Sequence, residues 1–100
     1  MSVRDRRTAS LIAAAPTAAA YVYLLRCRDG SLYCGWTDDL AGRLATHRRG
    51  KGSAYVRSRL PVELVWVEAC ADRSAAMRRE FAIKRLPRGE KLGLVKRKKA

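Results

Sequence analysis

The stretch YVYLLRCRDGSLYCGW, residues 21–36, contains two short apolar runs on either side of a turn sequence. Both runs, residues 21–27 and residues 31–36, are rich in aromatic and other apolar side chains, which favour strands. The Asp29-Gly30 pair between them is a strong hairpin signal. The stretch therefore predicts a β-hairpin, and the length of its loop decides which side chains share a face of the sheet.

Two loop lengths are compatible with this hairpin. A two-residue loop at Asp29-Gly30 would place Tyr23 and Tyr33 on opposite faces of the sheet. A three-residue loop at residues 28–30 would place the two tyrosines on one face, with Tyr23 opposite Gly35. The longer loop is a type I turn closed by a left-handed residue, and Gly30 stands at that position. We therefore favour the three-residue loop and keep the shorter one as the alternative.

The chain after the hairpin predicts a helix, a loop, a strand and two further helices. Thr37 or Asp38 can cap the first helix, which runs through His47 and ends before Gly50. The remaining predicted elements are a basic loop at residues 48–60, a strand at 62–71, a helix at 75–86 that Ser74 can cap, and a short helix at 88–95. This order predicts a small α/β (α+β) domain, with a mostly antiparallel three-stranded sheet flanked by helices.

The two ends of the chain differ from this domain in composition. Residues 1–18 are basic and then alanine-rich, and we interpret them as a disordered leader before a domain over residues 19–95. A secretory signal is the alternative, but Asp5 interrupts its basic part and Pro16 weakens its apolar part. Residues 96–100 form a basic tail. No apolar run reaches the length of about 18 residues that a transmembrane helix needs.

Charge and cysteine content narrow the possible partners and compartments. The 100 residues include 22 Lys and Arg against 9 Asp and Glu, a formal net charge of +13. A field of this sign favours a polyanionic partner, namely DNA, RNA or an anionic membrane surface. Three separated cysteines and one histidine do not form the four-ligand set of a structural zinc site. Reduced cysteines are expected in a cytoplasmic protein.

One acidic residue on the predicted second helix lies on its apolar side. The helical neighbours of Glu80 are Ala76, Met77, Ile83 and Lys84, and the three apolar ones should dock on the sheet. A carboxylate in that position is costly unless a cation or a metal ion accompanies it. A simple ion pair between Glu80 and Lys84, one turn apart, explains the residue equally well. The helix alone leaves both explanations open.

The two strand motifs resemble those of the GIY-YIG endonuclease superfamily. Tyr21-Val22-Tyr23 takes the place of the first motif and Tyr33-Cys34-Gly35 that of the second, with Tyr21 at the glycine position and Cys34 at the isoleucine position. The resemblance extends from about residue 21 to residue 95 and is closest to small stand-alone bacterial members. It adds three further residues in matching order: Arg43 ten residues after the second tyrosine, His47 one helical turn later, and Glu80 on a later helix.

The resemblance implies a phosphodiesterase mechanism with one divalent metal ion, Mg²⁺ or Mn²⁺, held by Glu80. It implies that Tyr33 is the general base that activates water and that neutral His47 relays the proton. Tyr23 would position the phosphate or the water, and Arg43 would stabilise charge in the transition state. One carboxylate can suffice for Mg²⁺, because waters and phosphate oxygens complete its octahedron.

We expect the bound partner to be nucleic acid, with DNA favoured, held mainly by electrostatic contacts. The expected contact residues are Arg48, Arg49, Lys51, Arg57, Arg59 and Lys84. The predicted function is a structure-directed or weakly specific DNA endonuclease. The alternative is a non-catalytic module that binds DNA or RNA, and a basic scaffold or membrane-surface protein is a more distant one. An enzyme requires Tyr23, Tyr33, Arg43 and Glu80 around one pocket.

Overall fold

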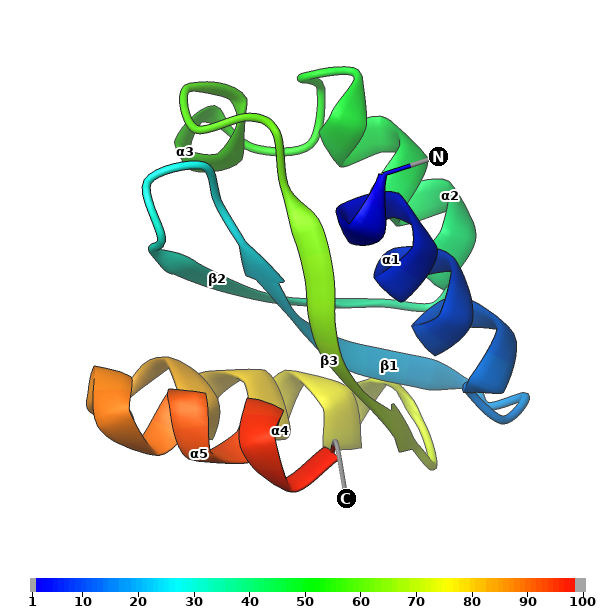
Figure 1. Ribbon diagram of the computed structural model, residues 1–100. Coiled ribbons are helices and arrows are strands. Elements are labelled where there is room, and N and C mark those ends of the chain that lie inside the picture. Colours follow the sequence, from blue (N-terminus) through cyan, green and yellow to red (C-terminus); the bar gives the residue numbers. More distant parts are fainter. Residues whose placement is uncertain (1, 99–100) are drawn as a thin grey trace.

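A three-stranded antiparallel sheet with helices on both faces forms the framework of the computed structural model, which describes residues 2–98 (Figure 1). The strands lie in the order β2-β1-β3, with β1 in the centre. The predicted α+β fold class is confirmed. In chain order the elements are α1 (Val3–Ala14), β1 (Ala20–Arg26), β2 (Leu32–Thr37), α2 (Leu40–Arg48), α3 (Ala54–Arg57), β3 (Glu63–Cys70), α4 (Arg73–Lys84) and α5 (Arg88–Lys98).

The hairpin between β1 and β2 has the three-residue loop. Tyr23 lies opposite Gly35 and Leu25 lies opposite Tyr33, as the longer loop requires. Gly30 closes the turn in the left-handed region with φ 85°, where a residue with a Cβ would be strained. The prediction that Tyr23 and Tyr33 share one face of the sheet is therefore confirmed.

Each face of the sheet carries its own hydrophobic core. Toward α4 and α5, the buried side chains Val22 and Leu24 pack with Ile83. On the opposite face, under α1, α2 and α3, Leu25 packs with Leu44. The strands are thus buried on both sides, which explains the nearly continuous apolar run of β1. Among residues 2–98, no helix is long and apolar enough to cross a membrane.

The predicted disordered leader at residues 1–18 is wrong, because α1 is a helix packed on β3. The Ser2 side chain caps this helix by accepting a hydrogen bond from the Asp5 amide at 3.1 Å. Buried Thr8 accepts a hydrogen bond from the Leu64 amide at 3.0 Å, beside a bulge in β3. The apolar side chains that α1 and the residue after it pack on the core are Leu11, Ile12 and Ala15.

The starts of two helices differ from the prediction, because their caps are not the predicted Thr37 or Asp38 and Ser74. Asp39 caps α2 and Asp72 caps α4, in each case by accepting a hydrogen bond from the amide three residues later. The predicted loop at residues 48–60 contains the short helix α3, which Ser53 caps. Helix α5 continues through residues 96–98 of the predicted basic tail, and residues 99–100 lie outside the described part of the chain.

Candidate active site

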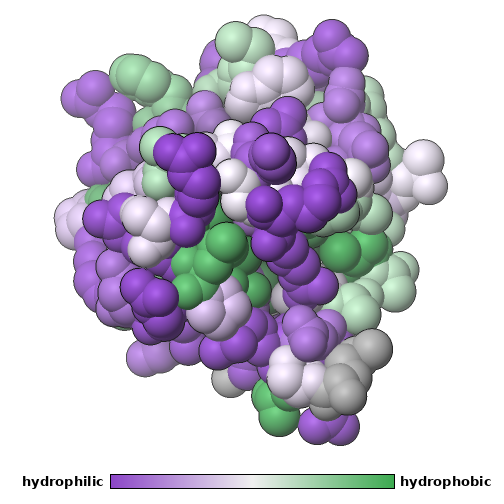
Figure 2. All heavy atoms as spheres, turned by 90° about the horizontal axis from the view of Figure 1, so that it is seen from above, coloured by the Kyte–Doolittle hydropathy of each residue, from purple (hydrophilic) through white to green (hydrophobic). Residues whose placement is uncertain are grey.

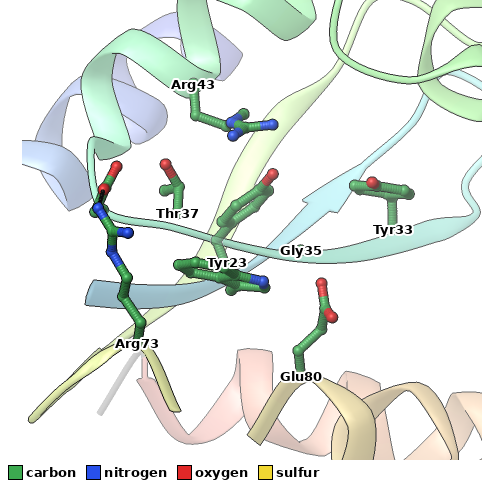
Figure 3. A pocket seen from close by; sticks show the side chains of 9 residues that line it. Tyr23, Tyr33, Gly35, Thr37, Arg43, Arg73 and Glu80 are labelled. Atoms are coloured by element: carbon green, nitrogen blue, oxygen red, sulfur yellow. Dashed lines mark hydrogen bonds and ion pairs between the residues drawn. The ribbon is translucent and has the colours of Figure 1, made fainter. Parts of the chain in front are cut away.

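A polar hollow of about 360 Å³ lies between the edge strand β2 and the helices α2 and α4 (Figure 3). We call it the central hollow. Glu80 reaches into it from α4, while Arg43 reaches toward it from α2 on the other side of Tyr23. The residues that line it are Tyr23, Tyr33, Gly35, Trp36, Thr37, Asp38, Arg43, Arg73 and Glu80. The four side chains that an enzyme requires therefore surround one pocket.

Tyr23 and His47 form a buried polar pair beside the central hollow. The Tyr23 hydroxyl lies 2.9 Å from His47 Nε2, and each residue is 1% exposed. Burial, and to a lesser extent Arg43, lowers the pKa of His47, so the ring is neutral near pH 7. Burial, reinforced by Tyr33, raises the pKa of Tyr23, so the phenol keeps its proton. The phenol can therefore donate its hydrogen bond to the imidazole.

The other nitrogen of the imidazole is a buried polar atom without a partner. Within residues 2–98, His47 Nδ1 makes no hydrogen bond. If Nε2 accepts the proton of Tyr23, this nitrogen carries the ring hydrogen. An unsatisfied buried group of this kind is costly, and such groups are commonly associated with catalytic sites.

Gly35 lies against the hydroxyl end of Tyr23. A Cβ at this position would lie 2.5 Å from the Tyr23 hydroxyl oxygen and 2.7 Å from the Cζ atom that carries it. No flexible side chain separates the two, so any larger residue would displace the phenol from His47. The backbone of β2 thus forms one wall of the hollow directly beside the hydroxyl.

Tyr33 is held by rings rather than by hydrogen bonds. Its ring stacks on Tyr55 of α3 with centroids 6.0 Å apart, and it makes a T-shaped contact with the His47 ring, with centroids 5.5 Å apart. The Arg59 guanidinium lies 3.8 Å from the Tyr55 ring centroid and forms a 3.0 Å ion pair with Asp29 in the hairpin loop. The Tyr33 hydroxyl has no hydrogen-bond partner in the described part of the chain.

Glu80 occupies the position that its helical spacing indicated, between the buried residues Ala76 and Ile83. Its side chain is 21% exposed and opens on the central hollow. The ion-pair explanation of this acid is met, because Lys84 Nζ lies 3.7 Å from a Glu80 oxygen, and the metal-ion explanation stays a prediction. Met77 does not dock on the sheet as predicted; it is 53% exposed, because only the Ala76 and Ile83 side of α4 faces the strands.

Sequence reasoning missed two charged residues of the hollow, Asp38 and Arg73. They form an ion pair of 2.6 Å, and both line the pocket. The available signal was positional: Asp38 directly follows β2 and Arg73 opens α4 directly after the turn from β3. Across residues 2–98, no group of three or more His, Cys, Asp or Glu side chains could hold a metal ion. Any metal ion in the hollow would therefore depend on few protein ligands.

None of the six predicted nucleic-acid-binding residues lines the central hollow. The face of the molecule drawn in Figure 2 is largely hydrophilic. Arg48 pairs with Asp5 of α1 at 3.2 Å, and Arg59 pairs with Asp29. Both cations are therefore partly neutralised by neighbouring acids. The other predicted contact residues are Arg49, Lys51, Arg57 and the Glu80 partner Lys84, and all four are exposed.

Comparison with known proteins agrees with this architecture. Residues 19–92 match the family model of the GIY-YIG catalytic domain. The chain therefore belongs to the GIY-YIG family and carries the catalytic domain of that nuclease family. The residues that resemble its motifs, from Tyr21 to Glu80, all lie inside the matched segment.

The similar proteins are small bacterial chains. The UPF0213 protein OB0043 of Oceanobacillus iheyensis is 52% identical over 75 residues, which cover 75% of this chain and 87% of that protein. The UPF0213 protein CPE1444 of Clostridium perfringens is 46% identical over 78 residues, covering 78% of this chain and 84% of that one. The solution NMR structure of the UPF0213 protein BH0048 from Bacillus halodurans is 44% identical, with a TM-score of 0.51, and the match covers 77% of this chain and 82% of that one.

Proposed function

We propose that the protein is an endonuclease that hydrolyses phosphodiester bonds in nucleic acid with the help of one divalent cation, and that its substrate is DNA. The observation that carries this proposal is the convergence of Tyr23, Arg43 and Glu80 on one polar hollow. A proton acceptor, a cation for the phosphate and a carboxylate for a metal ion are the groups that such a hydrolysis needs.

Tyr23 is the better supported general base. Its hydroxyl already has a proton acceptor, because neutral His47 lies 2.9 Å away. A proton taken from water by the Tyr23 oxygen can be matched by transfer of the phenolic proton to His47 Nε2, so no free phenolate has to form first. Tyr33 has no such partner within residues 2–98, and its stacked ring suits it to contact substrate. The roles that the resemblance implied for the two tyrosines are thus exchanged.

The donor chemistry of the hollow fits a hard divalent cation such as Mg²⁺ or Mn²⁺. Glu80 offers carboxylate oxygens, the ligands these ions prefer, and its only partner in the described chain is a lysine at 3.7 Å. Asp38, the other acid in the hollow, is already paired with Arg73. Glu80 would therefore hold the ion. When bound, the ion would polarise the phosphate and neutralise charge on the departing oxygen.

Arg43 is the cation best placed for the phosphate itself. It is exposed, lines the hollow, and forms no ion pair among the described residues. Its planar guanidinium can donate two parallel hydrogen bonds to phosphate oxygens. Because it starts without an acidic partner, it gives up no existing ion pair when the phosphate arrives. Arg43 therefore binds the reacting phosphate and stabilises the negative charge that develops on it.

Cleavage assays test this proposal directly. The substrates are labelled duplex DNA, single-stranded DNA, a branched DNA junction and RNA, each with Mg²⁺, Mn²⁺ or EDTA. We expect metal-dependent cleavage of at least one DNA by the unmodified chain and background cleavage by Glu80→Gln. The matched control is Glu90→Gln, an exposed acid in the first turn of α5, which should cleave normally.

Two results would contradict the proposal. Cleavage by Glu80→Gln at the normal rate would remove Glu80 from the chemistry. Tight nucleic-acid binding with no cleavage of any substrate would favour the non-catalytic binding module instead. A Tyr23→Phe variant separates the roles of the tyrosines, because it should lose cleavage and keep binding.

A further inference from the structure

A second hollow, of about 600 Å³, runs along the exposed side of α2. We call it the α2 groove. It is lined by Thr37, Asp38, Asp39, Gly42, Arg43, Ala45, Thr46 and Arg49. Three of these residues, Thr37, Asp38 and Arg43, also line the central hollow, so the two hollows are direct neighbours that share a boundary.

The acids of the α2 groove are already engaged. Asp38 forms the ion pair with Arg73, and the Asp39 carboxylate caps α2 by accepting a hydrogen bond from the Gly42 amide at 3.1 Å. Arg43 and Arg49 form no ion pair with any acid in the described chain. The unpaired charge of the groove is therefore positive.

Arg49 is directed into the groove, unlike its neighbour Arg48. Its Nη2 lies 3.4 Å from the Thr46 hydroxyl, which itself donates a hydrogen bond to the Gly42 carbonyl. Arg48 points the other way and pairs with Asp5 of α1. The consecutive residues Arg48 and Arg49 thus lie on different faces of α2. The sequence alone could not distinguish their positions.

We propose that a nucleic-acid strand leaves the central hollow through the α2 groove, with Arg49 binding a backbone phosphate near the one that Arg43 binds. This inference rests on the proposed function. Arg43 and Arg49 are six positions apart, about 9 Å along a helix axis. We therefore expect Arg49 to bind a different phosphate of the same strand, close to the reacting one. The groove therefore specifies the path of the substrate and gives no preference among base sequences.

A binding measurement on variants that lose one charge tests this path. The probes are a fluorescein-labelled DNA duplex and its labelled single strand, measured by anisotropy without metal and in a Glu80→Gln background so that no cleavage occurs. Arg49→Ala should weaken binding about fivefold and reduce the slope of log affinity against log salt by about 1. The control is Arg78→Ala, an exposed α4 arginine that lines neither hollow, which should change affinity by less than about twofold.

Variants that gain a charge test the same path through tighter binding, which an unfolded protein cannot produce. Ala45 is exposed and lines the α2 groove, whereas Ala82 is exposed on α4 away from both hollows. Ala45→Lys should tighten binding and steepen the salt dependence by about 1, and Ala82→Lys should do neither to the same extent. Circular dichroism melting curves confirm that each variant is folded.

The outcomes separate this inference from the proposed function. In one outcome both probes bind, while Arg49→Ala has the same affinity and salt dependence as Arg78→Ala, and Ala45→Lys the same as Ala82→Lys. In that case the α2 groove is not the path, and the nuclease proposal stands. If the Glu80→Gln protein binds neither probe, both proposals are overturned. A selective effect of the groove variants on either probe supports the path and identifies the form of DNA that uses it.

Discussion

Tyr23 and His47 show how burial shifts the pKa values of two ordinary side chains in opposite directions. Outside a protein a tyrosine keeps its proton up to a pKa of about 10, and a histidine is half protonated near pH 6.5. Here burial raises the pKa of Tyr23 and lowers the pKa of His47. A 2.9 Å hydrogen bond joins the two side chains. The pair is neutral at physiological pH, and in the proposed reaction His47 would accept the phenolic proton while the Tyr23 oxygen takes one from water.

The lowered pKa of His47 predicts a pH dependence of stability. In the unfolded chain the imidazole titrates near 6.5, whereas in the folded chain it stays neutral to lower pH. Between these two pKa values the unfolded chain binds the proton more strongly than the folded chain does. The free energy of unfolding therefore has its full value with respect to His47 above pH 6.5, and it falls as the pH decreases through this window. Thermal melts between pH 7.5 and pH 5 should show this decline.

His47→Gln provides the control for that measurement, because the chain has one histidine. The variant is expected to be less stable than the unmodified chain, since it disturbs the hydrogen bond to Tyr23. Its melting temperature should nevertheless change little between pH 7.5 and pH 5, because carboxylates titrate mainly below that range. An equal decline in both proteins would assign the effect to groups other than His47.

At the scale of secondary-structure elements, local turn chemistry was predictable and long-range docking was not. Gly30 indicated the loop length, and the loop length then determined that Tyr23 and Tyr33 share a face. Helix α1 was missed because its alanines contribute little amphipathicity. The Ser2-Asp5 spacing of an N-cap was nevertheless present, as was the apolar spacing of Leu11 and Ile12.

The contact between α1 and the sheet gives a testable stability difference. Thr8→Val keeps the shape of the side chain but removes the acceptor for the buried Leu64 amide, so we expect a loss of about 1–2 kcal/mol. Ser10→Ala, an exposed change on the same helix, should be neutral or slightly stabilising. Urea unfolding curves measure both. Equal stability of Thr8→Val and the unmodified chain would mean that α1 does not hold β3 in this way.

At the scale of the whole molecule, the central hollow lies where the layers on the two faces of the sheet approach each other at the β2 edge. Arg43 comes from the α2 layer, Glu80 from the α4 layer, and Tyr23 from the central strand. The motif residues of the site could be placed from the sequence because they resemble a known pattern. The Arg73–Asp38 pair could not, because it joins residues far apart in the chain whose separate positions say nothing about contact.

The net charge of +13 predicts how salt affects the stability of the whole protein. Like charges on a small domain repel, and added ions shorten the range of that repulsion to about 8 Å at physiological ionic strength. If screening contributes about 1 kcal/mol, the melting temperature should rise by roughly 4–8 °C between low and moderate sodium chloride. A melting temperature that falls with salt would mean that the surface ion pairs outweigh the repulsion.

The contacts from Asp29 through Arg59 and Tyr55 to Tyr33 have a practical consequence for anyone who modifies this chain. Exposed hairpin tips are usually safe places to insert a tag or a reporter peptide. Here Asp29 at the tip pairs with Arg59, and Arg59 packs on the stacked rings of Tyr55 and Tyr33 beside the central hollow. An insertion within residues 28–31 would therefore loosen the pocket from a distance, so an affinity handle belongs elsewhere on the molecule.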